Sequence, residues 1–413
     1  MSVLTEPPVT AAAPETLSFE EALAFARELR PRLVAEQAAT EERTYPSQEI
    51  HLEFAGAGFY NLLRPKTFGG YEFTLPEFMA VMREVARGCM STAWCLTLAS
   101  GHNLQIASWW PEEVQREVFA GDGHVAAPAV GAPGGKMRKV DGGWILNGTH
   151  KYSSGIPYAT HFIGHQFSDT GKPGPPGPMN IFMARRDQLE ILDDWGGTLG
   201  LKGSGSQSVC FEEVFIEDAW VLENRRQFDF DVSGGTAGLE LHGTPMYGGR
   251  ALGFFCNELA HLTIGGAWSA LDEYEEQLVT RTTFRPPPKP RVHDGDYQRW
   301  YAQSKVRLTA AEAITTRASQ LFMDYCEEAA AGGGAYTLER DQFMNQLSRE
   351  ALTMAWKTVE DPLLKTIGSS ATVNGSRMER IWRDLTMAWG HVNTILGDQI
   401  AREYTEAQFG VEK

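Results

Sequence analysis

The spacing of apolar residues changes twice along this chain, and that change limits the folds open to it. From about residue 17 to 122, apolar residues recur three and four positions apart, as in "SFEEALAFARELRPRLVAEQAATEER", which predicts helices. From about residue 123 to 230, short alternating runs such as "GGWILNGTH" and "MNIFMARR" are cut by Gly and Pro. This second pattern predicts an antiparallel β domain.

Helical spacing returns over residues 231–413 in four long segments, which favours an antiparallel helix bundle. Ser18 and Glu21 form a candidate capping box at the first helix start. Residues 1–16 are expected to be a flexible arm. The predicted class is α+β, with an N-terminal helical domain, a central β domain and a C-terminal four-helix bundle.

Charge and cysteine content exclude several classes of protein. The formal net charge is -16, and no long basic run occurs, which argues against nucleic acid or an anionic membrane as partner. The N-terminus has no signal-peptide pattern, and no run of 18 apolar residues is present. The five cysteines are scattered without CxxC spacing, which argues against a disulfide scaffold or a thiolate zinc site. We therefore expect a soluble, cytoplasmic protein.

The usual chemistry-bearing motifs are absent or weak. "LKGSGSQSVCFEEVFI" contains Gly-x-Gly, but a strand pattern follows where a dinucleotide site needs a helix. His161 and His165 share a strand-like run, where their spacing separates them by about 13 Å. Strand histidines are therefore favoured over a metal site. No GxSxG elbow occurs.

Two sites remain as candidates. Ser153 and Ser154 follow the "DGGWILNG" hairpin signal and, taken alone, are typical of a turn. His391 ends the segment "RMERIWRDLTMAWGH". Such a histidine is more often a core residue, although its pKa near neutrality also suits it to act as a general base.

Four motifs in order resemble the acyl-CoA dehydrogenase fold over residues 17–410. They are "GFYNLLRPKTFGGYEFTLPEF", "VDGGWILNGTHKYSSG", "RTTF" and "MERIWRD". The resemblance implies a flavoprotein and a homotetramer, in which Arg281 and Phe284 of "RTTF" reach the flavin of a neighbouring subunit.

One departure from the family pattern changes the expected chemistry. Acyl-CoA dehydrogenases commonly place a catalytic glutamate shortly after the Arg-Asp pair, whereas this chain has "RDLTMAWGHVNT". With "GCMSTAW" and "YSSG", this stretch is similar to the oxygenase components of two-component flavin monooxygenases, such as p-hydroxyphenylacetate hydroxylase and the steroid-ring phenol hydroxylases. Their second C-terminal histidine, the base, matches His391, while Thr386 replaces the first. N- and S-oxygenating relatives share the scaffold, so the kind of oxygenation stays open.

The resemblance implies a hydroxylase of small aromatic, phenol-like molecules in aromatic catabolism. A separate NAD(P)H:flavin reductase supplies reduced flavin, FMNH2 or FADH2 with FMN slightly favoured, which forms a C4a-hydroperoxide with O₂. His391, Ser153 and Ser154 are the implied catalytic residues. The implied flavin contacts are Ala127, Pro128, Tyr152, Ser153, Ser154, Ser204, Ser206, Arg281 and Phe284, and the implied substrate contacts are Trp94, His102, Asn103 and His391. The alternatives are an acyl-CoA dehydrogenase or oxidase and a non-enzymatic scaffold.

Overall fold

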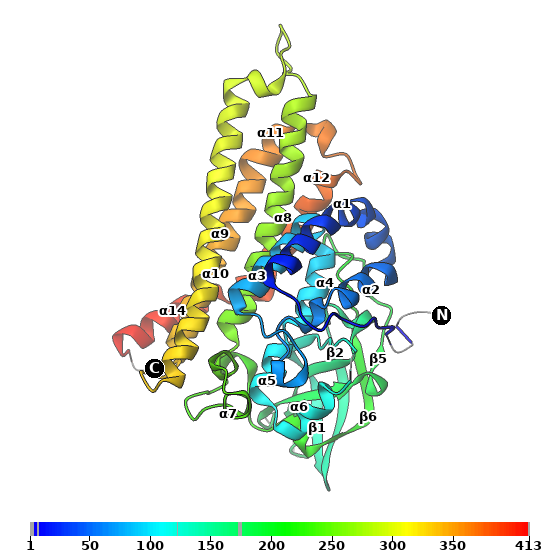
Figure 1. Cartoon of the computed structure of the whole chain (residues 1–413), viewed down its shortest axis with the longest axis vertical. Coiled ribbons are helices and arrows are strands. Elements are labelled where there is room, and N and C mark those ends of the chain that lie inside the picture. Colours follow the sequence, from blue (N-terminus) through cyan, green and yellow to red (C-terminus); the bar gives the residue numbers. More distant parts are fainter. Residues whose placement is uncertain (1–3, 6–7, 122, 172–175, 412–413) are drawn as a thin grey trace.

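The computed structural model describes residues 4–5, 8–121, 123–171 and 176–411. The long helices of the C-terminal part form an elongated upper region, and the sheet lies at the opposite end with several short helices beside it (Figure 1). The N-terminal helices are α1 (Phe19–Arg43), α2 (Gln48–Gly56), α3 (Leu75–Gly88), α4 (Met90–Ser100), α5 (Asn103–Trp109) and α6 (Glu112–Val118). The predicted capping box is confirmed, because Ser18 and Glu21 bond each other's backbone N–H at the start of α1.

The expected N-terminal arm is held against the protein where the structure describes it. The Val9 carbonyl lies 2.8 Å from His51 Nε2, and the Tyr71 hydroxyl donates to the Pro14 carbonyl at 2.6 Å. Residues 1–3 and 6–7 of this arm lie outside the described residues. The described part of the segment therefore contacts the N-terminal helices, and its flexibility stays a prediction.

The central domain is a seven-stranded mixed sheet in the order β5-β6-β2-β1-β3-β4-β7. The strands are β1 (Ala129–Val140), β2 (Gly143–His150), β3 (His161–Ser168), β4 (Met179–Arg185), β5 (Glu190–Ile191), β6 (Val209–Glu217) and β7 (Val221–Leu222). The prediction of a purely antiparallel sheet is wrong, because β1 and β3 pair in parallel. The chain leaves β2, passes through residues 151–160 and returns beside the far edge of β1.

The C-terminal part contains α7 (Ala237–His242), α8 (Leu252–Thr280), α9 (Gly295–Ala330), α10 (Leu338–Thr358), α11 (Lys365–Ile367), α12 (Arg377–Trp389), α13 (Val392–Ile395) and α14 (Gly397–Phe409). The four predicted segments correspond to α8, α9, α10 and the α12–α14 region. The last segment is not one helix, because α12 ends at Trp389 and residues 390–391 separate it from α13. This break brings His391 to a helix end.

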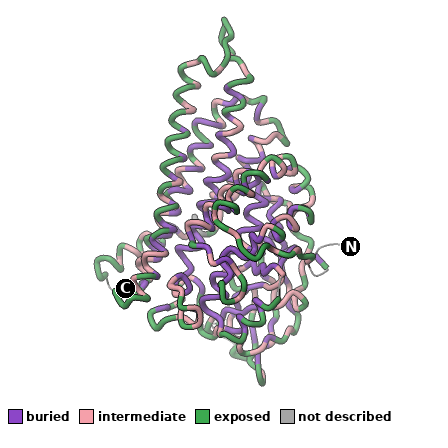
Figure 2. The backbone as a smooth tube through the Cα atoms, viewed as in Figure 1, coloured by how far each residue is buried: buried purple, intermediate pink, exposed green. Residues whose placement is uncertain are grey.

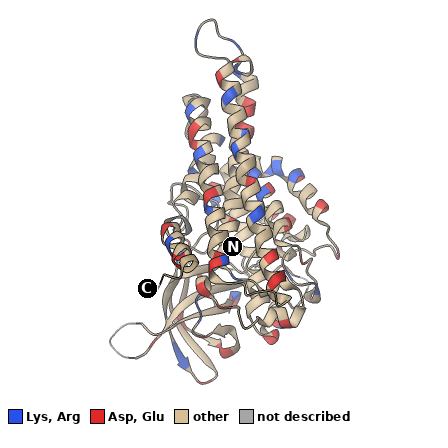
Figure 3. Cartoon of the chain, turned by 90° about the vertical axis from the view of Figure 1, so that its left-hand side faces the viewer, with Lys and Arg blue, Asp and Glu red and all other residues tan. Residues whose placement is uncertain are grey.

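Buried residues gather where the long helices meet the sheet (Figure 2). All residues of α4 except Leu98 are buried, and most of α8 is buried as well. A helix that is apolar on all sides belongs in a protein interior, so these two helices form the centre around which the domains pack. On the outer bundle helices, acidic and basic side chains are interspersed (Figure 3), as in the Arg317–Asp324 pair of α9.

The Arg-Asp pair of α12 joins all three parts of the fold. Asp384 accepts a hydrogen bond from the Leu201 backbone N–H at 2.6 Å and one from the Ser91 hydroxyl at 3.1 Å. Arg383 donates to Glu41 of α1 at 2.8 Å and to the Leu199 carbonyl at 3.0 Å. These contacts bind α12 to the N-terminal helices and to the loop that precedes β6.

A close backbone approach makes this junction possible. A Cβ on Gly200 would lie 2.1 Å from the Arg383 carbonyl oxygen, a distance that no side chain tolerates. Glycine at this position lets the loop pass directly over α12, so that the Leu201 N–H reaches Asp384.

We predict that Asp384→Ala lowers the free energy of unfolding by about 2–3 kcal/mol, because it leaves the buried Leu201 N–H and Ser91 hydroxyl without their acceptor. Asp384→Asn keeps an acceptor for the Leu201 N–H and is expected to lower the free energy of unfolding by less. Urea unfolding of both variants measures this difference, and equal losses would contradict it.

The same residue predicts a pH dependence. Burial raises the pKa of the Asp384 carboxyl to about 7, so the native state holds a proton that the unfolded state releases near pH 4. The stability that this group contributes at low pH is therefore lost as the pH rises through 7. The Asn variant does not titrate, and its stability relative to wild type should increase from pH 5 to pH 8.

Candidate active site

A cavity of about 520 Å³ lies between α4, α8, the end of α12 and loops of the central domain. Many residues proposed from the sequence share its wall, although they lie up to about 300 positions apart in the chain. They are Trp94, His102, Tyr152, Ser154, Ser204, Ser206 and His391. The fold thus gathers the residues of four sequence regions around one space.

Three serine hydroxyls form a connected chain on one side of the cavity. Ser204 Oγ lies 2.6 Å from Ser206 Oγ, which lies 2.9 Å from Ser154 Oγ. The Trp94 indole N–H donates to Ser154 Oγ at 3.1 Å. This series of hydroxyls links α4 to the central domain. The hydroxyls line the cavity, where each can donate or accept a hydrogen bond with a bound molecule.

The turn that carries Ser154 depends on glycine. Gly155 has φ +90°, and a Cβ there would lie 2.5 Å from the Cys95 carbonyl oxygen of α4. Its N–H donates to the carbonyls of Ser204 and Gly205 at 3.1 Å. This turn therefore presses both serine-bearing loops against α4.

His391 also lines the cavity and packs edge-on against Trp94, with ring centroids 5.8 Å apart. Its imidazole is surrounded by protein, and this burial lowers its pKa to about 4 because the charged form loses hydration. At neutral pH the ring is uncharged and has one unprotonated nitrogen. His391 can therefore accept a proton or a hydrogen bond from a molecule in the cavity.

His102 is a second neutral imidazole in the wall. Its Nδ1 lies 2.8 Å from the Ala127 carbonyl oxygen, so Nδ1 carries the proton and Nε2 is the acceptor. Burial lowers its pKa to about 4. The ring packs edge-on against Phe255 of α8 at 5.4 Å.

Several proposed contacts lie outside the cavity wall among the described residues. Asn103, proposed to bind substrate, is fully buried and donates to the carbonyls of Tyr60 and Val125, so it fastens α5 to its neighbours. Ala127 and Pro128 lie behind the wall, where Ala127 orients His102. Ser153 is also buried behind it, and its Oγ has no hydrogen-bond partner.

Arg281 and Phe284 lie far from this cavity, beyond the upper end of α8 in the bundle-tip loop seen in Figure 1. The Arg281 guanidinium donates to the Ser370 hydroxyl. The Phe284 side chain is 100% exposed. Within one chain, neither residue reaches the residues around His391.

Sequence reasoning did not identify much of the apolar wall, which includes Phe228, Phe255, Leu259 and Met387. Phe255 and Leu259 lie four positions apart on α8, and Met387 lies four positions before His391. On α8 this spacing places the two side chains on one helix face, a signal that the sequence contained, whereas α12 ends at Trp389, before His391. Gln227 and Phe228 come from a single 3₁₀ turn, Gln227–Asp229, which is too short to show such a signal.

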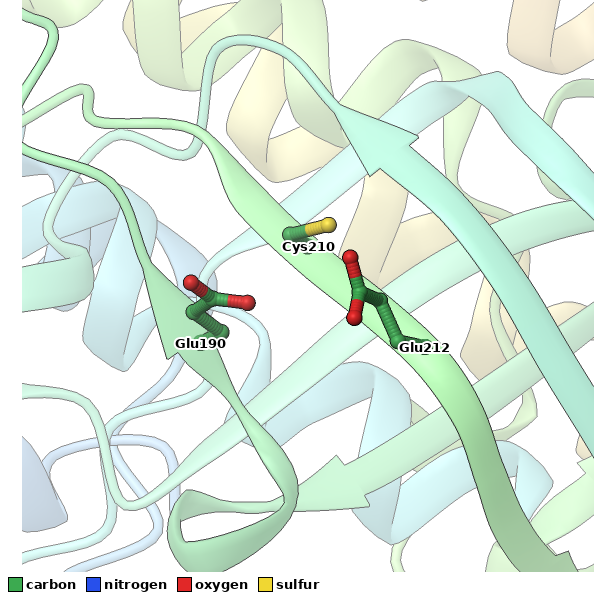
Figure 4. A group of neighbouring side chains, drawn as sticks. All are labelled: Glu190, Cys210 and Glu212. Carbon is green, nitrogen blue, oxygen red and sulfur yellow. The ribbon is translucent and has the colours of Figure 1, made fainter.

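One group of potential metal ligands occurs among the described residues, at Glu190, Cys210 and Glu212 (Figure 4). It lies on β5 and β6, with both glutamates exposed and no contribution to the cavity wall. His161 and His165 lie on β3 as expected, and His165 Nδ1 contacts the Val130 carbonyl at 2.7 Å. None of the described helices combines the length and apolar content needed to cross a membrane.

Glu258 is an unusual residue behind the cavity wall. It lies on α8 between the wall residues Phe255 and Leu259 and is fully buried. Neither carboxyl oxygen has a hydrogen-bond partner, and Oε1 is packed against Gly101 beside His102. Burial raises the pKa of this carboxyl well above its usual value, because the charged form loses its hydration, and so favours the protonated form of the side chain.

Comparison with known proteins places these features in a family. Residues 16–121 match the family model "Acyl-CoA dehydrogenase, N-terminal domain", and residues 258–394 match "Acyl-CoA dehydrogenase, C-terminal domain". These matches confirm the resemblance noted in the sequence.

Relatives and solved structures agree with that assignment. The chain is 27% identical to the flavin-dependent monooxygenase oxygenase subunit HsaA of Rhodococcus jostii, over 79% of this chain and 82% of the relative. It is 24% identical to the p-hydroxyphenylacetate 3-hydroxylase oxygenase component of Acinetobacter baumannii, over 87% and 82%. The structure of XiaF from Streptomyces sp. in complex with FADH2 and glycerol shares the fold, with a TM-score of 0.84, 20% identity and coverage of 95% and 96%.

We predict that Glu258→Met raises the free energy of unfolding by roughly 1–3 kcal/mol, because it removes a buried carboxyl without a partner and keeps the side-chain length. The raised pKa means that wild type loses stability as the pH rises above about 4.5. The gain in the Met variant should therefore be larger at pH 8 than at pH 5, as measured by urea unfolding. A variant less stable than wild type at both pH values would contradict this account of Glu258.

Proposed function

We propose that this chain, which belongs to the acyl-CoA dehydrogenase family, is the oxygenase component of a two-component flavin-dependent monooxygenase. It takes reduced flavin from a separate reductase, uses O₂ and hydroxylates a small aromatic molecule. The observation that carries this proposal is the identity of the base in the cavity. His391 lines it, and no Asp or Glu does among the described residues, whereas thioester dehydrogenation in this family commonly uses a glutamate.

The cavity residues fit a flavin. Ser154, Ser204 and Ser206 present hydroxyls to the cavity, and hydroxyls match the carbonyl and N–H groups along the edge of a flavin ring. Ser153 Oγ, buried beside them without a partner, is a further hydrogen-bonding group for this region. Tyr152 and Trp195 pack together at the cavity margin, with ring centroids 5.0 Å apart.

When bound, reduced flavin, FMNH2 or FADH2, would supply the electrons that activate O₂, with one oxygen atom entering the substrate and the other leaving as water. The protein contributes the shape of the cavity, the exclusion of water and the control of protons. Most of the wall consists of aromatic and aliphatic side chains. These side chains limit the water that could divert the oxidant toward H₂O₂.

His391 has the role of proton acceptor for the substrate hydroxyl. Since burial lowers its pKa to about 4, the ring is unprotonated across the physiological pH range. A phenol is a weak acid at rest, but its proton becomes more acidic as the ring carbon forms a bond to oxygen. A weak base that is fully unprotonated and correctly placed is therefore sufficient to take that proton.

Assembly is proposed to complete the flavin site. Phe284 is fully exposed at the tip of the bundle, and exposed aromatic residues of this kind are common anchors of subunit interfaces. We propose a homotetramer in which Arg281 and Phe284 contact the flavin of a neighbouring subunit. All five cysteines are free, which supports a cytoplasmic location, where thiols remain reduced.

We predict that His391→Ala lowers the rate of product formation by roughly 10²–10⁴-fold, the usual effect of losing a positioned base. Consumption of O₂ should continue, with H₂O₂ replacing the hydroxylated product. The measurement is turnover coupled to a flavin reductase, with product and H₂O₂ quantified separately. His293→Ala, at an exposed residue outside the cavity, is the matched control. Wild-type product formation by the His391 variant would show that the base is wrongly assigned.

We predict that Phe284→Ala weakens flavin binding by roughly tenfold, the loss expected for one aromatic anchor, without lowering the melting temperature of the subunit. Light scattering should give the mass of a tetramer for wild type. Phe409→Ala, which removes an equally large side chain that is 77% exposed, should leave flavin affinity unchanged. This assembly would be refuted if the wild-type protein is a monomer and if Phe284→Ala binds flavin with the wild-type affinity.

A further inference from the structure

The wall of the cavity carries very little charge, and what it carries lies at one place. Among the described residues of its wall, Lys151 is the only Lys, Arg, Asp or Glu. Lys151 is exposed and precedes Tyr152, whose side chain is 57% exposed. The charge therefore lies at the solvent side of the cavity, next to the serine-bearing turn proposed to hold the flavin.

Another part of the wall is apolar and aromatic. Phe255 and Leu259 of α8 are buried there, and the Phe228 and Phe255 rings meet nearly at right angles, with centroids 6.5 Å apart. Leu98 of α4 lies one helical turn after Trp94. The edges and faces of these rings provide the contacts that flat aromatic molecules prefer.

The polar groups in this part are uncharged. His102 and His391 both have a pKa lowered to about 4 by burial, so neither ring carries a positive charge near pH 7. Gln227 is buried, and its amide N–H donates to the Gln105 side-chain oxygen at 3.3 Å. Each of these groups can form a hydrogen bond with a hydroxyl or a carbonyl, but none can neutralise an ion.

Burial of a charge without a partner is costly. A carboxylate or ammonium group that enters such a wall loses its hydration and gains no opposite charge in return. A phenol of the same shape loses only the hydration of a hydroxyl, which His391 can replace with a hydrogen bond. The wall thus discriminates by charge as well as by shape.

We infer that the substrate of this cavity is an uncharged aromatic molecule, and that aromatic compounds bearing a carboxylate are excluded. This inference rests on the proposed function and specifies its substrate class. It depends on the neutral lining formed by Leu98, Gln227, Phe228, Phe255 and Leu259.

The test compares three probes of related shape: 2-naphthol, 6-hydroxy-2-naphthoate and its methyl ester. Binding to the flavin-loaded full-length protein is measured by calorimetry, apart from turnover. Naphthol and the ester should bind at least about tenfold more tightly than the carboxylate, as expected for loss of hydration without a counter-charge. If the ester binds as weakly as the carboxylate, size and not charge determines the affinity, which contradicts the inference. Tighter binding of the carboxylate than of its ester would overturn the inference directly.

A substitution that adds a charge to the cavity wall tests the same inference by changing the protein and keeping the probes. Leu98→Arg adds a guanidinium to the wall and should reverse the preference between the carboxylate and its ester. Val306→Arg, on an α9 residue that is 68% exposed, is the matched control and should leave it unchanged. If melting curves show that the Leu98 variant is unfolded, Met387→Lys introduces a cation from α12 instead. A folded cavity variant with the wild-type preference would contradict the inference.

Failure of this inference and failure of the proposed function give different results. Neutral probes that bind preferentially but yield no hydroxylated product leave the charge preference standing and refute the oxygenase activity. A carboxylate that binds preferentially and is hydroxylated leaves the oxygenase activity standing and refutes the charge preference.

Discussion

The buried carboxyl group of Asp384 holds together the three parts of the structure at the point where the cavity forms. Its two oxygens accept from the Leu201 N–H and the Ser91 hydroxyl, while the neighbouring Arg383 binds Glu41. Leu201 itself lines the cavity, and His391 follows the end of α12, the helix that carries Asp384. The position of His391 relative to the three serine hydroxyls therefore depends on these few buried polar contacts.

Desolvation is the second constraint on the site. It lowers the pKa values of His102 and His391 and raises that of Glu258, so it favours the uncharged form of each group. The result is an interior that contains bases and an acid but very little net charge. Such an interior suits chemistry that moves protons to and from a neutral substrate, and it explains why an imidazole and not a carboxylate is the available acceptor.

Much of the fold could be predicted because it is encoded locally. The 3.6-residue spacing identifies α1, α3, α8, α9 and α10, and the Ser18–Glu21 box marks the first helix start. The parallel pairing of β1 with β3 could not be predicted in this way, because it depends on where the chain crosses the sheet after β2. The segment that His391 ends was identified, but the helix stops at Trp389, before Gly390, and a separate helix follows from Val392, which the sequence pattern did not predict.

The site shows the same division between local and distant information. Trp94, Ser154, Ser206 and His391 were identified from motifs, and the structure brings them together. Asn103 adjoins His102 in sequence, but its side chain points into the packing between α5 and its neighbours, which only the tertiary structure determines. Gln227 and Phe228 lie in a segment without periodic spacing, so no pattern in the sequence indicated their place in the wall.

The central claim is that this protein inserts an oxygen atom from O₂ into an aromatic substrate. Reductase-coupled turnover under ¹⁸O₂, with the product analysed by mass spectrometry, tests it most directly. The account predicts a product that carries one ¹⁸O atom under ¹⁸O₂ and none when the label is in the water. An oxidised product without label from O₂, or oxidation of an acyl thioester in place of an aromatic compound, would contradict it.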